Sequence, residues 1–231
     1  MNQKKKESLI KYLKSIVQTA TFEKSINSMI EEARSIGRRK DWLWHELIVS
    51  ISTWGNSERA KNLLENVSMM EQLNYEQLKA KSIQEAEYTI NTVIPQAKIG
   101  VRNISPERKA SILFKNFKLL QDLGGCEKVS IFLLNIQGRE AKIRFLTLFH
   151  GVSEKYARNI FMDIYHADFI NSIAIDDRIG KVLNYLEVNP DLTYIEKESI
   201  LQEIATICSL NGWALDRYLY NNMNEFMEKN N

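Results

Sequence analysis

The chain of 231 residues has few of the residues that build covalent or metal-based scaffolds. It contains two cysteines, Cys126 and Cys208, and three histidines, His45, His150 and His166. Two thiols cannot form a disulfide framework, and they cannot supply the four ligands of an all-cysteine metal site within one chain. The histidines are scattered along the sequence. We therefore predict that the protein has no metal site.

Glycine and proline are also scarce, with nine and three residues. The long stretches between them carry apolar residues at the spacing of one helical face. Hydrophobic residues make up 44% of the chain, which is ample for a packed core. The sequence therefore predicts an all-α fold.

No apolar run approaches the roughly 20 residues that a membrane-spanning helix needs. The chain begins with the polar sequence Met-Asn-Gln-Lys-Lys-Lys-Glu and continues into an amphipathic helix, which is not the pattern of a secretory signal peptide. We therefore expect a soluble, cytoplasmic monomer that does not associate with membranes.

Apolar periodicity predicts where the helices lie. One start is well marked, because Ser105 can serve as N-cap and Pro106 as the first helical residue. The expected helices are two within 7–35 that separate near 19–21, then 41–52, 58–67, a weaker stretch within 71–93, 105–120, 177–186 and 195–210. A break is expected at 95–100, and the apolar segments 130–134 and 143–149 lead into the stretch described next.

The most informative stretch lies between residues 146 and 183. Apolar residues lead into a turn at Gly151 and Val152, and a new helical period starts at Ser153. Glycine suits the turn because it tolerates backbone conformations that are closed to other residues. Ser153 is a good N-cap, so the first amide groups of the second helix remain available for an anion. The stretch therefore predicts a hairpin of two helices that can hold a DNA phosphate.

Positive charge gathers around this hairpin, although the net charge is only +2. Between Ala97 and Arg158 there are 12 lysines and arginines against 5 aspartates and glutamates, a difference of +7. The chain is acidic from Leu186 onward. Any one such cluster is more often a solvated helix face. An excess on both sides of a phosphate-binding turn nevertheless favours a nucleic-acid surface.

The hairpin and a segment after it resemble a known family. Residues 149–157 read Phe-His-Gly-Val-Ser-Glu-Lys-Tyr-Ala, and residues 175–179 read Ile-Asp-Asp-Arg-Ile. Both are similar to segments of the helix-hairpin-helix DNA glycosylase superfamily, which includes endonuclease III and the 8-oxoguanine glycosylases. The resemblance places Lys155 at the position of the family's Schiff-base lysine and Asp176 at that of its catalytic aspartate. Ser153 replaces the family's second glycine but keeps its backbone N–H.

Other segments resemble the family in the same order along the chain, so that the likeness covers most of residues 41–220. One is the helix–loop–helix around residues 41–57, whose loop residue in the family fills the space left by a flipped nucleotide. The matching position is Trp54, with Asn56 as the alternative, and a core role suits Trp54 equally well. A second is Lys109-Ala110 near the start of its helix.

The last similar segment is Leu-Asp-Arg-Tyr-Leu-Tyr at residues 215–220, which resembles the C-terminal part of the shorter, cluster-free 8-oxoguanine glycosylases. It makes Trp213 and Asp216 candidates for the base pocket, although a core position is the more common role of such a tryptophan. Asp216 could equally cap a turn. The DNA contacts that the resemblance implies are Gly151, Val152, Ser153, Trp54, Asn56, Lys109 and Arg178.

The resemblance also implies a domain organisation. A six-helix barrel would span residues 38–167, and residues 1–37 with 168–231 would form a second helical domain, with a cleft between the two. The family's iron–sulfur cluster is excluded because one cysteine, Cys208, follows the hairpin. No cofactor is expected, and a structural monovalent cation at the hairpin is the one ion that the resemblance leaves open.

The function implied is excision of a damaged base, with 8-oxoguanine favoured, followed by strand cleavage. Lys155 would attack the sugar as a neutral amine, which burial or a cationic neighbour such as Lys109, Arg158 or Arg178 would promote. Asp176 would stabilise positive charge on the sugar. Lys155 alone would be an ordinary surface lysine and Asp176 alone an ordinary N-cap. Their joint occurrence at the family's spacing favours the catalytic pair.

Three alternatives remain open at this point. The enzyme could remove another damaged base, such as an oxidised pyrimidine. The chain could be a non-catalytic helix-hairpin-helix protein that only binds double-stranded DNA. It could also be a helical protein-interaction module, which would show no salt-dependent binding to a duplex.

Overall fold

The computed structural model describes residues 1–101 and 103–230, and for residues 223–230 it describes the backbone alone. Within these residues the chain forms fourteen α-helices and one 3-10 turn, and its extended pairing is limited to an isolated bridge between Val101 and Ile104. The predicted all-α fold is confirmed. None of the helices in the described ranges has the length and hydrophobicity that crossing a membrane would require.

The chain divides into two compact units. The hairpin unit spans Arg38–Ile160, and the terminal unit combines Met1–Gly37 with Phe161–Asn231. The sequence placed the second boundary after residue 167, whereas this division falls inside a helix at residue 160. Packing accounts for the earlier position, because the ring of Phe161 stacks on that of Phe169 at a centroid distance of 4.7 Å.

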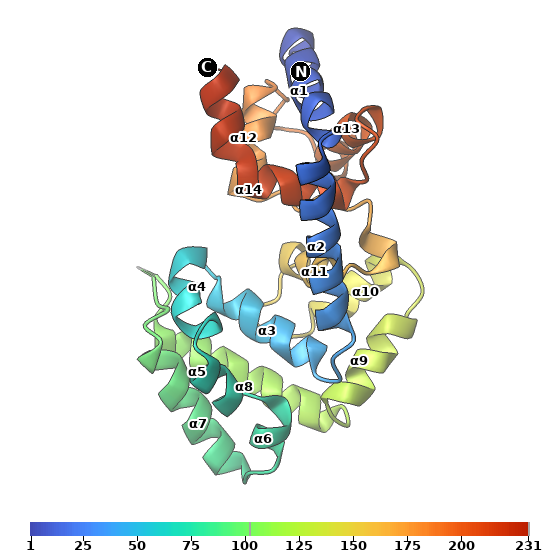
Figure 1. Ribbon diagram of the computed structural model, residues 1–231. Helices are drawn as coiled ribbons and strands as arrows, with labels where there is room; N and C mark the ends of the chain where they lie inside the picture. Colours follow the sequence, from blue (N-terminus) through green and yellow to red (C-terminus); the bar gives the residue numbers. More distant parts are fainter. Residues whose placement is uncertain (102, 231) are drawn as a thin grey trace. The chain divides into compact units, whose positions relative to one another are not determined.

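Nine of the helices begin within the hairpin unit (Figure 1). They are α3 (Trp42–Ser52), α4 (Ser57–Leu64), α5 (Val67–Gln72), α6 (Tyr75–Lys79), α7 (Ile83–Gln96), α8 (Pro106–Asp122), α9 (Cys126–Asn135), α10 (Arg139–Leu146) and α11 (Glu154–Asp163). Helix α3 is apolar on nearly every side and is buried, as its sequence predicts. Helices α7 and α8 pack side by side along their length.

Aromatic side chains from three helices form the centre of the hairpin unit. The ring of Trp44 lies edge-on to Tyr75 and Phe117, at centroid distances of 6.2 and 5.8 Å. The indole N–H of Trp44 donates to the carbonyl of Leu73 at 2.6 Å, which satisfies its one buried polar atom. This cluster fixes α3, which leads into the Trp54 loop, and α8, which carries Lys109.

Two local expectations were wrong. The helix expected over residues 58–67 ends at Leu64, because Asn66 caps a new helix by accepting from the amide of Met69 at 3.1 Å. The break expected from Pro95 begins after Gln96, because α7 continues through the proline for one more residue. Proline lacks a backbone N–H, and in the last turn the loss of that one hydrogen bond does not end the helix.

The terminal unit contains the remaining helices, α1 (Gln3–Val17), α2 (Ala20–Gly37), the 3-10 turn η1 (Ala167–Phe169), α12 (Asp177–Tyr185), α13 (Tyr194–Ile207) and α14 (Gly212–Asn230). The hydroxyl groups of Tyr12 and Tyr218 lie 3.1 Å apart and join α1 to α14. Thr193 and Glu196 form a capping box at the start of α13, in which each side chain accepts from the other residue's backbone amide.

Candidate active site

The hairpin between α10 and α11 is built as the sequence predicts. Gly151 has φ +77°, and the amide of Val152 donates to the carbonyl of Phe149 at 3.2 Å. Ser153 precedes α11, and its hydroxyl accepts from the amide of Tyr156 at 3.5 Å. The first turn of α11 therefore presents amide groups that have no acceptor within the helix.

Only glycine fits at position 151 without strain. A φ of +77° is unfavourable for a residue with a side chain. A Cβ atom there would also lie 3.2 Å from Ile112 Cγ2 and 3.2 Å from the six-membered ring of Trp54. The turn is thus pressed against α8 and against the loop that follows α3.

Asn116 of α8 braces the hairpin from inside the unit, and sequence reasoning missed it. Its side-chain amide donates to the carbonyl of His150 at 3.0 Å, and its oxygen accepts from the His150 amide at 2.7 Å. Asn116 is fully buried. A buried amide that bonds both the N–H and the carbonyl of one residue holds the turn in a single orientation.

Lys155 lies in the first turn of α11 and is half-buried. Its ammonium nitrogen is 5.5 Å from the centroid of the Tyr156 ring. Arg158, one turn further on, is buried and forms an ion pair with Glu154 at 3.5 Å. Asn159 follows at the i+4 position, and its buried Oδ1 has no hydrogen-bond partner among the residues that the structure describes. The helical face of Lys155 therefore carries both a buried cation and a buried acceptor.

Trp54 is half-buried in the loop after α3. Its ring lies edge-on to Tyr156 at a centroid distance of 6.5 Å, which places it beside the hairpin. Tyr156 is the residue that follows Lys155 in the chain. Asn56 is exposed and caps α4, because its oxygen accepts from the amide of Arg59 at 3.0 Å. Both residues lie where the sequence placed them, and a wedge role for either stays a prediction.

The structure does not support the predicted DNA contact of Lys109. Lys109 is fully buried, and its ammonium group donates to the carbonyls of Ser52, Trp54 and Ile99 at 2.8, 2.9 and 2.9 Å. Three acceptors use all three of its hydrogens. Burial lowers the pKa of Lys109 to about 8. The lysine joins the end of α3 and the Trp54 loop to the segment after α7.

Burial also reduces the positive charge that the region 97–158 shows to solvent. Lys109, Lys142 and Arg158 are all buried, with 0%, 2% and 4% of their surface exposed. Sequence counting could not separate these cations from the exposed ones on α8, such as Lys115 and Lys118.

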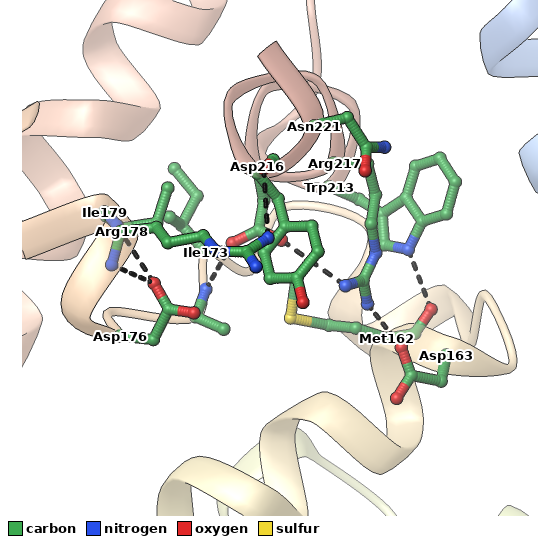
Figure 2. Close-up of polar contacts among 12 residues, drawn as sticks. Met162, Asp163, Ile173, Asp176, Arg178, Ile179, Trp213, Asp216, Arg217 and Asn221 are labelled. Atoms are coloured by element: carbon green, nitrogen blue, oxygen red, sulfur yellow. Dashed lines mark hydrogen bonds and ion pairs between the residues drawn. The ribbon is translucent and has the colours of Figure 1, made fainter. Parts of the chain in front are cut away.

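Asp176 belongs to the terminal unit and caps α12. Its Oδ1 accepts from the amides of Arg178 and Ile179, both at 2.9 Å (Figure 2). Negative charge is stabilised at a helix N-terminus. The guanidinium carbon of Arg178 lies 3.8 Å from the centroid of the Tyr220 ring, and one of its nitrogens donates to the Tyr220 carbonyl at 3.3 Å. Contact between Arg178 and DNA stays a prediction.

The predicted base-pocket roles of Trp213 and Asp216 are not supported, because both side chains are buried within the terminal unit. The indole of Trp213 donates to the carbonyl of Met162 at 2.7 Å (Figure 2) and lies edge-on to Tyr165. Asp216 Oδ1 accepts from the amide of Ala174 at 2.8 Å. These are core contacts, which was the alternative for the tryptophan.

The ionisation of Asp216 is strongly perturbed. Burial raises its pKa from 3.8 to about 7, and the nearby charge of Arg217 partly opposes that rise. Arg217 in turn pairs with Asp163 at 2.6 Å and lies 3.6 Å from Asp216 Oδ2 (Figure 2).

Across the described residues, no group of three or more histidine, cysteine, aspartate or glutamate side chains is arranged to hold a metal ion.

Comparison with solved structures first defines the class of fold. The chain has the helical architecture of 8-oxoguanine DNA glycosylases, which matches the fold predicted from the hairpin and its downstream aspartate. No family model matches the sequence, and a search of curated proteins gave no match.

Three solved structures illustrate the likeness. The Methanocaldococcus jannaschii 8-oxoguanine glycosylase/lyase, in complex with a 15mer DNA that contains 8-oxoguanine, superposes with a TM-score of 0.65 at 18% identity, over 92% of this chain and 95% of that one. A structure of the M. jannaschii 8-oxoguanine DNA glycosylase gives 0.65 at 16%, over 92% of each chain. The 8-oxoguanine DNA glycosylase of Thermotoga maritima gives 0.65 at 17%, over 93% and 95%.

Proposed function

We propose that the protein is an intracellular, monomeric base-excision repair enzyme that removes an oxidised purine, 8-oxoguanine in the first instance, and cleaves the strand at the resulting site. The observation that carries the proposal is the placement of Lys155 in the first turn after a glycine hairpin. It is supported by the glycosylase-like fold, which extends over more than nine-tenths of the chain.

In the proposed reaction the damaged nucleotide is flipped out of the duplex, at a cost of roughly a few kcal/mol. The amides at Gly151, Val152 and Ser153 hold the backbone phosphates, and Trp54 fills the vacated stack. No cofactor takes part, and a monovalent cation at the hairpin would add to phosphate binding.

The neutral amine of Lys155 then attacks the sugar C1′. The bond between C1′ and the base breaks, and the base leaves with the bonding electrons and takes up a proton. The amine nitrogen loses a proton, and opening of the sugar ring gives an imine. Loss of a proton from C2′ expels the 3′ phosphate, and hydrolysis of the imine releases Lys155. Asp176 stabilises the positive charge that develops on the sugar.

Attack requires Lys155 as a neutral amine. Lys155 is half-buried, and the guanidinium of Arg158 on the same helix is buried and paired with Glu154. The ammonium of Lys109 is held by three carbonyls and takes no part in this step.

The test is borohydride trapping on a duplex with 8-oxoguanine opposite cytosine. Reduction of the imine gives a stable covalent adduct, so the natural protein is expected to form one and Lys155→Gln to form none. Lys79→Gln is the matched control, because Lys79 is exposed on α6 and pairs with Glu76. It should trap as the natural protein does.

A panel of other damaged bases and an abasic site extends the test. Adducts with another lesion but not with 8-oxoguanine would correct the substrate. Binding to DNA without an adduct on any lesion or on the abasic site would contradict the proposal and would leave a helix-hairpin-helix protein that only binds DNA. No salt-dependent binding to any duplex would remove DNA as the partner altogether.

A further inference from the structure

The segment that leads to Asp176 has no secondary structure of its own. Residues 173–176, here called the strap, run between the turn after η1 and the start of α12 without helical or strand hydrogen bonding. Ile173 and Ala174 are buried. Buried backbone amides need acceptors, and an irregular segment cannot supply them from its own ladder.

Side chains from two distant helices provide these acceptors. The amide of Ile173 donates to Glu198 Oε1 at 3.0 Å, and the amide of Ala174 donates to Asp216 Oδ1 at 2.8 Å. The hydroxyl of Tyr194 accepts from the amide of Ile175 at 3.2 Å and donates to the carbonyl of Ile173 at 2.7 Å.

The three supporting residues are themselves held in place. Glu198 and Asp216 are buried, with 2% and 3% of their surface exposed. Tyr194 and Glu198 stand one turn apart on α13, whose start is fixed by the capping box of Thr193 and Glu196. Asp216 extends from α14 to the strap (Figure 2). The amides of three consecutive strap residues thus bind rigid side chains.

We propose that Tyr194, Glu198 and Asp216 are positioning residues for Asp176, because they fix the strap from which its carboxylate projects. The proposal rests on the function proposed above. None of the three needs to touch the substrate. A misplacement of about 1 Å in a catalytic group can cost a factor of about 100 in rate, so a loosened strap should slow the chemical step while DNA binding persists.

The experiment compares variants by single-turnover excision of 8-oxoguanine and by affinity for the same duplex. Tyr194→Phe removes the oxygen that forms two hydrogen bonds with the strap, with little change in shape. Asp216→Leu removes the acceptor and keeps a side chain that branches at Cγ, and Asp216→Asn keeps an acceptor. We expect Tyr194→Phe and Asp216→Leu to lower the excision rate about 10-fold to 100-fold. Affinity should change less than about threefold, and Asp216→Asn should restore most of the rate.

Two comparisons separate positioning from a general loss of stability. Glu196→Ala weakens the capping box of the same helix and leaves the strap contacts intact, so it should lower Tm by about 3 °C without slowing excision. Asp176→Asn keeps a good N-cap but removes the carboxylate. If Tyr194 acts through Asp176, then Tyr194→Phe should have no further effect on rate in the Asp176→Asn background.

Hydrogen exchange of the strap amides provides a readout that needs no activity. Exchange at residues 173–175 should be slow in the natural protein and about 10-fold faster or more in Tyr194→Phe. Unchanged exchange, or an undiminished effect of Tyr194→Phe in the Asp176→Asn background, would overturn the inference. A natural protein that excises no lesion would instead overturn the proposed function and with it the catalytic purpose of the strap, whereas exchange would still show whether it is braced.

Discussion

The two units each hold an irregular backbone segment with a buried ionisable side chain, but one side chain donates hydrogen bonds and the other accepts one. In the hairpin unit the ammonium of Lys109 donates to three carbonyls around the Trp54 loop. In the terminal unit the carboxyl group of Asp216 accepts from an amide of the strap before Asp176. Each buried group serves a segment that carries a predicted functional residue.

The comparison shows how a helical protein can fix segments that lie outside its helices. Carbonyls left over at the end of a helix, such as that of Ser52, collect around a cation, whereas amides of an extended segment need an acceptor. A side chain from a helix supplies the missing partner in both cases. Burial makes each such contact costly to lose, because the partner is left unsatisfied.

The largest expected effect comes from removing the cation. Lys109→Met keeps the side-chain volume but leaves three carbonyls without their donor, at roughly 1–3 kcal/mol each. We expect the free energy of unfolding to fall by about 5 kcal/mol, measured by urea denaturation. Lys115→Met is the control, because Lys115 is exposed on the same helix and should change stability by less than about 0.5 kcal/mol. Equal losses from the two variants would contradict the role given to Lys109.

The carboxyl group of Asp216 predicts a pH dependence. Its folded-state pKa of about 7 lies above the ordinary 3.8, so the folded protein prefers the neutral form. The stability that this group contributes is present below pH 4 and is lost as pH rises through 7. A rise of about three pKa units corresponds to about 4 kcal/mol. Arg217, Asp163 and Asp176 are the charged groups that face the same carboxyl group.

Asp216→Asn isolates that dependence. The natural protein should lose stability relative to the variant between pH 4 and pH 7, with little further change above pH 8. Urea unfolding at several pH values measures the difference between the two proteins, which removes the contribution of other titrating groups. A difference that does not vary with pH would show that Asp216 is charged throughout.

The hairpin depends on the backbone conformation of a glycine, which is a third kind of support. A comparison of two glycines separates the cost of that conformation from the cost of steric contact. Gly151 and Gly138 have φ values of +77° and +83°, but a Cβ atom at Gly138 would meet nothing within 4 Å. Gly138→Ala should therefore cost about 1 kcal/mol from the backbone alone. Gly151→Ala should cost about 2 kcal/mol, because the added atom also presses on Ile112 and Trp54. Duplex affinity should fall only for Gly151→Ala.

These supports also show what the sequence could reveal. The hairpin was predictable because glycine, the N-cap serine and Lys155 are neighbours in the chain, and their spacing reflects local geometry. The carbonyl contacts of Lys109 were not predictable, because a cation looks the same in sequence whether it meets phosphate or carbonyl oxygens. The contacts that hold the strap could not be predicted from the sequence, since Asp216 lies 42 residues from its partner Ala174. Contacts at that separation depend on how helices pack, and no local pattern records them.

The smallest expected effect concerns the two candidates for the wedge in the loop that Lys109 holds. Asn56 caps α4, so Asn56→Ala should lower stability by about 1 kcal/mol, or Tm by about 2–4 °C. Asn56→Ser keeps a capping oxygen and should keep Tm. If Trp54 is the wedge, both variants should excise 8-oxoguanine at the natural rate at 20 °C, and Trp54→Ala should be slower. If Asn56→Ser were slow while its Tm was normal, Asn56 would be the residue that enters the duplex, and the packing of Trp54 on Gly151 and Tyr156 would be structural.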